Sequence, residues 1–470
     1  MVKNSFLFTA FLFIATIFLH VPIAEAATEY ESNDSLSTAT PISFKGSKAD
    51  VDGILSDRYD DDYFSFTLTE PGKVVLKINH NLNTRYEVRL INAQQETLED
   101  YTTTYNVNKG VKELFSQGLD AGTYYVKVEH YDGNGESVPY KLQVDYTQSS
   151  VYEKEFNNDR STANLINLNK QYNGWADYDS DYYVIEVPSS GEVKVEMNRT
   201  LKTSYEISLY NSAGSEMESW YTYYGKDSMI PVIHTGLPQG TYYIKIRTTD
   251  GDRDNIPYRF KVNFKANSLF ETEDNDSMSL ADTLKVSKAM NGVISSRSDS
   301  DYYSLNLTKN MNIAVQLTAS KDTSYDVQIF NQDNSVYESL YTNYGNGKLK
   351  TIKNLNLKKG IYYIKLRRYD GESNKIPYTL KVIQRDTTPP ATPTVNKVTT
   401  KSTKVTGKAE KGATVYVYRG QTKLGQATAS SSGTYSVKIP KQKKDTTLKI
   451  YAKDVAGNKG KIKTIKVKKP

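Results

Sequence analysis

Most of the chain alternates apolar and polar residues with a period of two, in short runs separated by Gly, Asn and Asp. The runs are rich in Tyr, Val, Ile and Thr, as in "GTYYVKV", which begins at Gly122. This period is that of a β-strand with one buried face, whereas helical periodicity is weak beyond the first residues. The sequence therefore predicts an all-β protein of many short antiparallel strands, folded as sandwiches or jelly rolls.

The strand pattern occurs three times, with a period of about 120 residues. Each copy opens with E-x-E-x-N-[DN], continues through a glycine to D-x-D-Y-[FY], and ends with G-[TI]-Y-Y-[VI]-K, Asp-Gly and a Pro-Tyr strand. A period of this length fits an independent domain rather than one unit of a solenoid. We expect three tandem jelly-roll-like β-sandwich domains, at residues 28–148, 149–266 and 267–385.

A proline-rich segment separates the third copy from a different tail. "DTTPPATP", residues 386–393, is predicted to form a stiff, extended linker. Residues 394–470 alternate again, in runs such as "ATVYVYRG" and "TLKIYAKDVAGNKG", over a length that suits a small sandwich. The tail is therefore predicted to be a C-terminal immunoglobulin-like β-sandwich.

The first residues have the pattern of a signal peptide. Lys3 precedes an apolar run from Phe6 to Ile23, and small residues around Ala26 suit a signal peptidase. We therefore interpret residues 1–26 as a signal peptide, since no later run reaches the roughly 20 apolar residues of a membrane span. The chain has no cysteine, so cores or metal ions must stabilise its domains. The composition suggests a secreted protein of a Gram-positive bacterium.

The formal net charge of +6 conceals two parts of opposite charge. From Asp386 onward, 19 Lys and Arg face 4 Asp and Glu, a net charge of +15, whereas the preceding residues carry 41 against 50, a net charge of −9. A basic tail predicts attraction to wall polymers or acidic polysaccharides rather than nucleic acid. The alternative is that these lysines only keep a small domain soluble. The chain ends without an LPxTG-type motif, so we expect any wall attachment to be non-covalent.

Two acidic clusters recur in every copy and could together hold a hard cation. Calcium takes about six to eight oxygen ligands, mostly carboxylate and carbonyl. Alternation in the opening segment points Glu29, Glu31 and Asn33 to one side, and the aspartate pair follows about 30 residues later. The alternative is that these acids cap strand ends and keep the surface hydrated. Copy two is the weakest candidate, because Asn158 replaces an aspartate and the loop before Asp181 is shorter. The candidate ligands are Glu29, Glu31, Asn33, Asp34, Asp60, Asp62, Glu153, Glu155, Asn157, Asn158, Asp179, Asp181, Glu271, Glu273, Asn275, Asp276, Asp299 and Asp301.

Catalysis by the paired carboxylates is less favoured. Acid–base chemistry on a glycoside requires one acid in a site dry enough to raise its pKa. Alternation puts Phe64 and Phe66 in the core and the aspartates just before the strand enters it, where we expect them to be hydrated or metal-bound. Three copies of a binding site multiply affinity, whereas three copies of one active site would be unusual. No HExxH, GxSxG or P-loop motif occurs, so we expect no enzymatic activity.

Tyrosine is abundant, with 38 residues against two tryptophans. In "GTYYVKV" the apolar face takes Tyr124, Val126 and Val128, which leaves Tyr125 and Lys127 on the other face. A stripe of Tyr with Lys or Arg suits contact with sugars or with a collagen-like rod. The alternative is that tyrosines simply favour strands and fill half-buried faces. "SWYTYYG" and "SLYTNYG" add aromatics in a predicted loop or edge strand. The candidate ligand-binding residues are Tyr125, Lys127, Tyr243, Lys245, Arg247, Tyr363, Lys365 and Arg367.

The ordered set of motifs resembles the bacterial pre-peptidase C-terminal domain, which is related to the collagen-binding domains of clostridial collagenases. The resemblance covers roughly three quarters of the mature chain. Through "TPPATPTV", "VTGKAEKGATV" and "DVAGNKG", the tail resembles the bacterial immunoglobulin-like modules of surface proteins. These resemblances imply a secreted accessory or adhesive module without catalysis of its own. They also imply a calcium site at the opening segment and sheet-face tyrosines as ligand contacts.

We therefore expect a secreted, non-catalytic and multivalent binding or adhesion protein. Calcium-stabilised repeats would bind an extracellular polymer, which could be a collagen-like protein, a polysaccharide or an anionic wall polymer. The basic tail would favour association with the cell wall. One alternative is an accessory or spacer protein for a secreted hydrolase, without a ligand of its own. Another is an unrecognised enzyme that cleaves glycosides or proteins.

Overall fold

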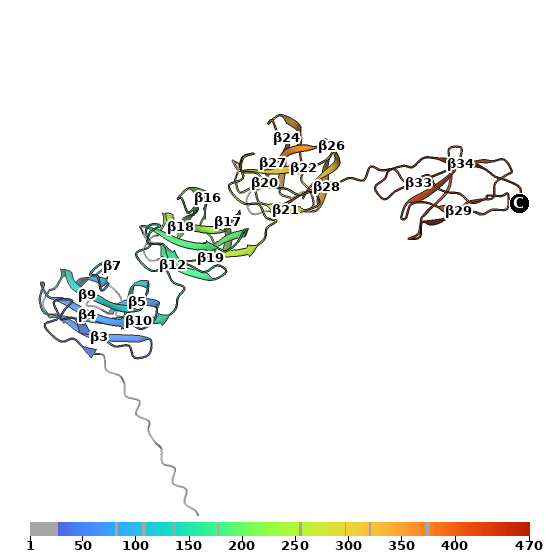
Figure 1. Ribbon diagram of the computed structural model, residues 1–470. Helices are drawn as coiled ribbons and strands as arrows, with labels where there is room; N and C mark the ends of the chain where they lie inside the picture. Colours follow the sequence, from blue (N-terminus) through green and yellow to red (C-terminus); the bar gives the residue numbers. More distant parts are fainter. Residues whose placement is uncertain are drawn as a thin grey trace, which may run out of the picture.

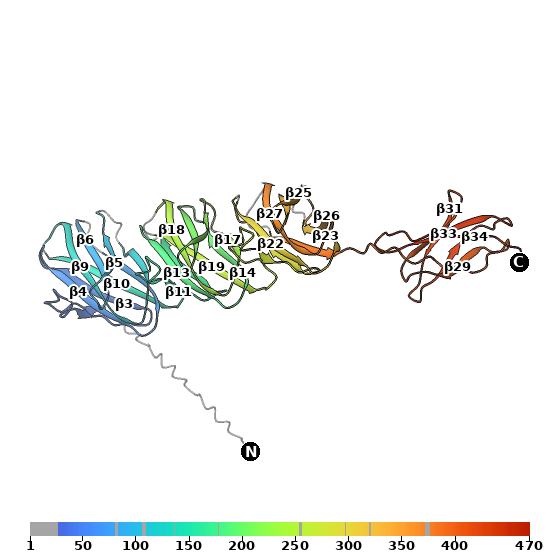
Figure 2. The same cartoon turned by 45° about the horizontal axis from the view of Figure 1, so that its top comes forward.

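The computed structural model describes residues 27–79, 83–105, 110–135, 137–176, 178–252, 256–296, 298–318, 321–371 and 377–470. Within these residues the chain forms strands and turns, and none of them forms a helix that could cross a membrane. The predicted signal peptide, residues 1–26, lies outside the described residues. Three sandwiches follow one another in a row, and a fourth lies beyond an extended segment (Figures 1 and 2). The prediction of an all-β fold with tandem sandwiches is confirmed.

The first repeat pairs two sheets, with strand orders β1-β3-β10-β5-β8 and β2-β4-β9-β6-β7. Apart from the two-residue strands β1 and β2, eight strands remain, and the first of them pairs with the last while the second pairs with the seventh. This is the strand order of a jelly roll. The strands are β1 (Ala27–Thr28), β2 (Thr40–Pro41), β3 (Lys48–Leu55), β4 (Asp61–Leu68), β5 (Gly72–Asn79), β6 (Thr84–Ile91), β7 (Thr97–Thr102), β8 (Lys112–Leu119), β9 (Gly122–Gly133) and β10 (Val138–Gln148).

The second and third repeats have the same eight-stranded order. Their sheets are β12-β19-β14-β17 with β11-β13-β18-β15-β16, and β21-β28-β23-β26 with β20-β22-β27-β24-β25. The second repeat consists of β11 (Asn164–Leu165), β12 (Gln171–Ala176), β13 (Ser180–Val187), β14 (Gly191–Asn198), β15 (Thr203–Asn211), β16 (Glu216–Tyr221), β17 (Met229–Leu237), β18 (Gly240–Gly251) and β19 (Ile256–Ala266). The third consists of β20 (Asp282–Thr283), β21 (Ala289–Gly292), β22 (Ser300–Leu307), β23 (Met311–Thr318), β24 (Thr323–Asn331), β25 (Val336–Tyr341), β26 (Leu349–Leu357), β27 (Gly360–Gly371) and β28 (Tyr378–Gln384).

Each repeat has one core between its two sheets, filled by the inward row of every strand. Along β4, Phe64 and Phe66 have 0% and 2% of their surface exposed, as the alternation predicts. Tyr183 and Tyr303 occupy the place of Phe64 in the other repeats and are also fully buried. Burying such a ring contributes roughly 1.5–3 kcal/mol, so the inward rows supply much of the folding free energy.

The tail is a smaller sandwich with its own core. A two-stranded sheet, β29-β32, packs over a four-stranded sheet, β31-β30-β33-β34. Residues 385–398, which include the predicted linker, form no strand. The strands are β29 (Lys404–Lys408), β30 (Thr414–Arg419), β31 (Thr422–Thr428), β32 (Thr434–Lys438), β33 (Thr447–Lys453) and β34 (Lys463–Lys466).

Candidate metal centres and candidate binding faces

The opening segment of each repeat joins the two sheets at one end of the sandwich. In the first repeat Glu29 N donates to Asp52 O of β3 at 3.2 Å, and Tyr63 N of β4 donates to Asn33 O at 3.0 Å. The same bond to the opening asparagine recurs from Tyr182 and Tyr302. The acidic motif therefore lies against the start of the strand that carries D-x-D-Y-[FY].

The two acidic clusters meet in all three repeats. Carboxylate oxygens from both clusters lie within 4.8 Å of one another in each repeat, as the sequence analysis required for a shared cation. A cis peptide bond follows the second glutamate of the motif in every repeat. The groups are Glu29, Glu31 and Asp62; Glu31, Asp34 and Asp60; Glu155, Asp179 and Asp181; and Glu271, Glu273 and Asp301.

A tyrosine of the closing strand completes each group, and the sequence analysis did not single it out. Tyr140 donates to Asp62, Tyr258 donates to Asp181 at 2.5 Å, and Tyr378 donates to Asp301. The recurring Pro-Tyr motif contains this tyrosine. Its position beside the acidic group depends on the pairing of the first strand with the last, which local periodicity does not reveal.

The first glutamate is fixed by three donors in the third repeat. Val293 N donates to Glu271 Oε1 at 2.5 Å, while the hydroxyl oxygens of Tyr303 and Tyr378 lie 3.0 and 2.8 Å from Oε2, and Tyr378 shares its one proton between Glu271 and Asp301. The second repeat has the same arrangement around Glu153. In the first repeat Phe64 stands where the other repeats have a tyrosine, so one of these donors is missing there.

The aspartates are buried, so of our two expectations for the strand mouth, hydrated or metal-bound, the first is wrong and the second stays a prediction. Asp62 and Asp301 have no exposed surface, and Asp181 has 4%. The reason is the alternation of side chains along β4. Asp62 lies two residues before Phe64, so its side chain belongs to the same inward row. Burial raises the pKa of Asp62 to about 9, and burial likewise raises the pKa of Asp301 well above its ordinary value. These carboxyl groups therefore need a proton or a nearby cation.

The first aspartate of each D-x-D pair and the fourth residue of each opening motif have different surroundings. Asp60 and Asp299 accept hydrogen bonds from Ser56 N and Ser295 N, both at 2.5 Å, so each also closes its own loop. This is the capping role that we considered as an alternative. The fourth position of the opening motif is exposed in every repeat, at Asp34, Asn158 and Asp276.

The amide oxygens of the opening segments fit a cation. Asn275 is fully buried and its Oδ1 has no hydrogen-bond partner, although its Nδ2 donates to Asp282. In the first repeat, one orientation of the Asn33 amide lets its nitrogen donate to Glu31 Oε2 at 3.1 Å and Asp62 Oδ1 at 3.2 Å. The other orientation places Asn33 Oδ1 beside Glu31 Oε2 and Asp62 Oδ1, and a cation would stabilise these three oxygens. Carboxylate and amide oxygens in this number suit calcium rather than a softer metal.

The second repeat, which the sequence marks as the weakest candidate, also brings three carboxylates together. There the group consists of Glu155, Asp179 and Asp181, whereas Glu153 is fully buried and bound by Trp175 N and two tyrosine hydroxyls. Burial raises the pKa of Glu153 well above its ordinary value. Asn158 replaces an exposed candidate ligand and leaves the buried acids in place.

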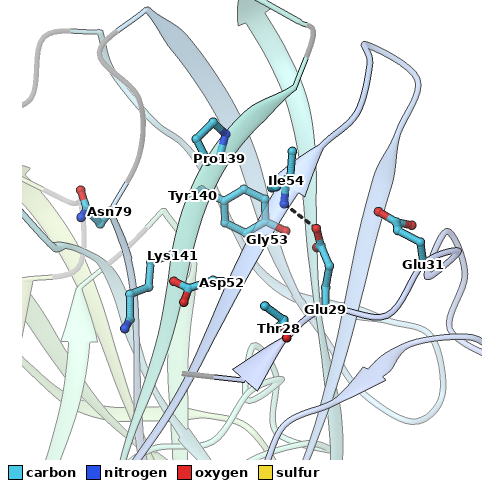
Figure 3. A pocket seen from close by; sticks show the side chains of 10 residues that line it. All are labelled: Thr28, Glu29, Glu31, Asp52, Gly53, Ile54, Asn79, Pro139, Tyr140 and Lys141. Carbon is cyan, nitrogen blue, oxygen red and sulfur yellow. Dashed lines mark hydrogen bonds between the residues drawn. The ribbon is translucent and has the colours of Figure 1, made fainter. Parts of the chain in front are cut away.

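A pocket of about 700 Å³ lies beside the acidic group of the first repeat. Figure 3 shows Glu29 with its carboxylate toward Ile54 N, and the ring of Tyr140 beside Gly53. Glu31 and Asp52 also line this pocket. The acidic group can therefore be reached from a concave surface.

The predicted ligand-binding residues lie on the outer face of the other sheet. Tyr125, Tyr243 and Tyr363 are half-buried on β9, β18 and β27, and Lys245 and Lys365 lie over tyrosine rings of the neighbouring strand. Acidic side chains on the same or the neighbouring strand partly neutralise three of the cations of this face, and the sequence alone does not locate these pairs. Lys127 pairs with Asp61 and Glu129, Arg247 with Glu206, and Arg367 with Asp326.

Exposed tyrosines at the sheet edge extend this face in two repeats. Tyr221 ends β16 and Tyr341 ends β25, with 45% and 57% of their surface exposed, and each lies opposite the acid that pairs with the arginine. The sequence predicted a loop or an edge strand for "SWYTYYG" and "SLYTNYG", and each motif begins in the edge strand and continues beyond its end. Thr102 occupies this position in the first repeat, where Lys127 is also only 9% exposed. The faces of the second and third repeats are therefore the more aromatic.

Comparison with known proteins supports this architecture. A family of bacterial Ig domains matches residues 389–469, which confirms the resemblance predicted for the tail. The cell wall-associated protease of Bacillus subtilis (strain 168) is 36% identical over 110 residues, and collagenase ColT of Clostridium tetani (strain Massachusetts / E88) is 28% identical over 142 residues. These matches cover 23% and 28% of this chain, but only 12% and 14% of those relatives.

Solved structures include similar domains. The pre-peptidase C-terminal domain of a collagenase from Bacillus anthracis covers 22% of this chain and 93% of its own, with 18% identity and a TM-score of 0.19. The BSP domain of a biofilm-associated protein covers 90% of this chain and 96% of its own, with 10% identity and a TM-score of 0.17. The motif-based resemblance to collagenase-associated domains thus agrees with the sequence comparison.

Proposed function

We propose that this chain is a secreted, non-catalytic binding protein whose three sandwiches present repeated faces to an extracellular polymer. The basic tail holds the array at an anionic matrix such as the cell wall. Calcium at the opening segments supplies positive charge to the buried carboxylates and so fixes each segment against its sandwich. The second and third repeats carry the main binding faces.

The observation that carries this proposal is the recurrence of one aromatic row on two sandwiches. In the second repeat Tyr221, Glu206 and Arg247 lie side by side on three neighbouring strands. In the third repeat Tyr341, Asp326 and Arg367 occupy the same places. Two equivalent faces on one chain bind a repetitive polymer with more affinity than either alone. The half-exposed tyrosine rings provide contact area at a low cost in conformational entropy.

The test is a pelleting assay of the mature chain with insoluble collagen, chitin and peptidoglycan. We expect binding to at least one polymer, and a loss of roughly tenfold in affinity when Tyr221→Ala and Tyr341→Ala are combined, as for central aromatic contacts in other interfaces. Tyr59→Ala is the matched control, because Tyr59 is 94% exposed on a loop of the first repeat. Binding to none of the three polymers would favour the spacer interpretation instead.

The role of the tail is tested separately by removing residues 386–470. We expect the shortened chain to lose its retention on cell walls at low salt, because its net charge becomes negative. Unchanged retention would exclude the tail as the wall-binding part. The collagen, chitin and peptidoglycan assay then still reports on the repeats.

A further inference from the structure

The tail domain has a surface that combines stacked aromatic rings with lysines. On the outer face of the β31-β30-β33-β34 sheet, the rings of Tyr416 and Tyr418 both stack against Tyr451. The ring centroids are 5.1 and 5.9 Å apart, and the ring planes differ by 18° and 19°. The three half-buried rings therefore form one continuous aromatic patch.

Five lysines surround the three rings. Lys459 Nζ lies 4.2 Å from the ring centre of Tyr451, and Lys423 Nζ lies 5.4 Å from that of Tyr416. The other three are exposed on the same face, where the register sets Lys449 opposite Tyr418, Lys453 opposite Thr414 and Lys466 opposite Thr447. We call this surface the tyrosine–lysine face; its residues are Tyr416, Tyr418, Lys423, Lys449, Tyr451, Lys453, Lys459 and Lys466.

Acidic side chains do not interrupt this face. Within the described residues 394–470, the acids are Glu410, Asp445 and Asp454, and all three lie in loops rather than in strands of the sheet. Asp445 pairs with Lys444, and Asp454 accepts hydrogen bonds from Asn458. The positive charge of the face is therefore available to a partner.

The opposite sheet of the tail provides an internal comparison. Lys404, Lys408 and Lys438 are exposed on β29 and β32, but the tyrosine of that sheet, Tyr435, is 4% exposed and belongs to the core. Both faces thus carry lysines, and one of them adds aromatic surface. Charge alone does not require stacked rings, so the rings indicate a partner that has flat apolar faces as well as negative charge.

We propose that the tyrosine–lysine face binds an anionic polysaccharide, with lysines paired to its acidic groups and tyrosines packed against its sugar rings. This inference rests on the proposed role of the tail as the matrix-binding part, and it names the surface and the partner. Such a polymer is attracted to a tail of net charge +15 and repelled by a body of net charge −9. It would therefore bind at the tail and leave the faces of the repeats free.

Three soluble probes separate the two contributions when they are titrated against the full mature chain. Polygalacturonate has both sugar rings and carboxylates, poly-L-glutamate has carboxylates without sugar rings, and dextran has sugar rings without charge. We expect polygalacturonate to bind at least tenfold more tightly than either of the other probes. Equal affinity for poly-L-glutamate would overturn the part assigned to the tyrosines.

Two charge-matched triple variants locate the site. We expect Lys449→Gln, Lys453→Gln and Lys466→Gln together to weaken polygalacturonate binding at least tenfold. The control removes three charges from the opposite sheet through Lys404→Gln, Lys408→Gln and Lys438→Gln, and we expect less than a threefold effect.

The outcomes of this comparison are distinct. An equal loss in both triple variants would overturn the tyrosine–lysine face while leaving charge-driven association of the tail intact. Failure of the unaltered chain to bind any anionic polymer would overturn the role of the tail itself. A third variant, Tyr451→Ala, tests stacking, with its melting temperature as the check on folding; full affinity in a folded variant would also contradict the proposal.

Discussion

Asp301 shows how a single polar residue in an apolar row can define a site. It starts the inward row of β22, so it is buried before the first core residue of the strand, Tyr303. An unpaired buried carboxylate is strongly disfavoured, and such a group either binds a proton or is compensated by opposite charge. Glu271 and Glu273 lie in the same group and increase the need for compensation.

Replacing Asp301 by Asn should remove one calcium site. The substitution keeps the shape of the side chain and its acceptor for Tyr378, but it deletes one negative ligand. We expect calorimetric titration of the mature chain to show one bound calcium fewer, and the calcium-induced rise in melting temperature of one repeat to disappear. At a free calcium concentration about 100 times Kd, a site contributes about 2.7 kcal/mol. Asp274→Asn, an exposed change in the same segment, is the control. Equal calcium stoichiometry in Asp301→Asn and the unaltered chain would contradict this assignment.

The raised pKa values predict how chelated protein responds to pH. Burial raises the pKa of Glu29 to about 7 and that of Asp62 to about 9, so the folded state holds protons that the unfolded state has released. The stability from this protonation is complete below about pH 4 and is lost as the pH rises through those folded values. In chelator, we expect the melting temperature of the first repeat to fall between pH 5 and 9. Calcium should abolish the fall, because it favours the ionised carboxylates. A pH-independent melting temperature in chelator would count against the buried acidic group.

At the scale of the element, a glycine lets two strands and the opening segment meet. A Cβ on Gly292 of β21 would lie 2.2 Å from Glu271 Oε2 and 2.4 Å from Tyr378 Oη. Gly53 and Gly174 have the same neighbours in their repeats. The recurring glycine before the acidic cluster is thus explained by close approach rather than by a turn.

Gly292→Ala should displace the opening segment of the third repeat. We expect a loss of about 1–3 kcal/mol, as for other overpacked sites, together with weaker calcium binding by that repeat. Denaturant unfolding with and without calcium measures both effects. Gly240→Ala is the control, because a Cβ there meets only the ring of Tyr242, at 3.5 Å or more, and the φ of Gly240 lies outside the left-handed region. Equal effects of the two substitutions would show that close packing at Gly292 is unimportant.

Alternation predicted the elements well because it reports what each strand buries. The inward row of Phe64 and Phe66 follows directly from it. For the segments that carry Tyr221 and Tyr341 the sequence left a loop or an edge strand open, and both tyrosines end edge strands. The site was only half predictable. The sequence predicted that the two acidic motifs of each repeat could meet. It did not predict that Tyr140, which lies 78 residues after Asp62 on the closing strand, donates a hydrogen bond to that aspartate. Such contacts depend on sheet order, which a single sequence does not encode locally.

At the scale of the whole molecule, the opening segments of the second and third repeats also pack against the preceding repeat. A Cβ on Gly118 of β8 would lie 1.9 Å from Glu153 O, and a Cβ on Gly236 of β17 would lie 1.8 Å from Glu271 O. Glu273 N donates to Gly236 O at 3.0 Å. The register places Asn356 at the same position of β26 in the third repeat, which no further jelly roll follows. Glycine therefore occupies this position only where another repeat docks.

Gly236→Val should separate the second and third repeats while leaving each of them folded. Valine suits a strand, so β17 itself should tolerate it, but its side chain would occupy the space of the Glu271 carbonyl. We expect small-angle scattering to show a larger maximum dimension and a broader distribution of distances, because the two sandwiches would move independently. The effect should remain in saturating calcium, since the proposed calcium ligands join the opening segment to its own sandwich and not to the previous one. Asn356→Val makes the corresponding change where no repeat follows, and its scattering profile should match that of the unaltered chain. If Gly236→Val also matched it, the row of sandwiches would have to be held by contacts other than this strand.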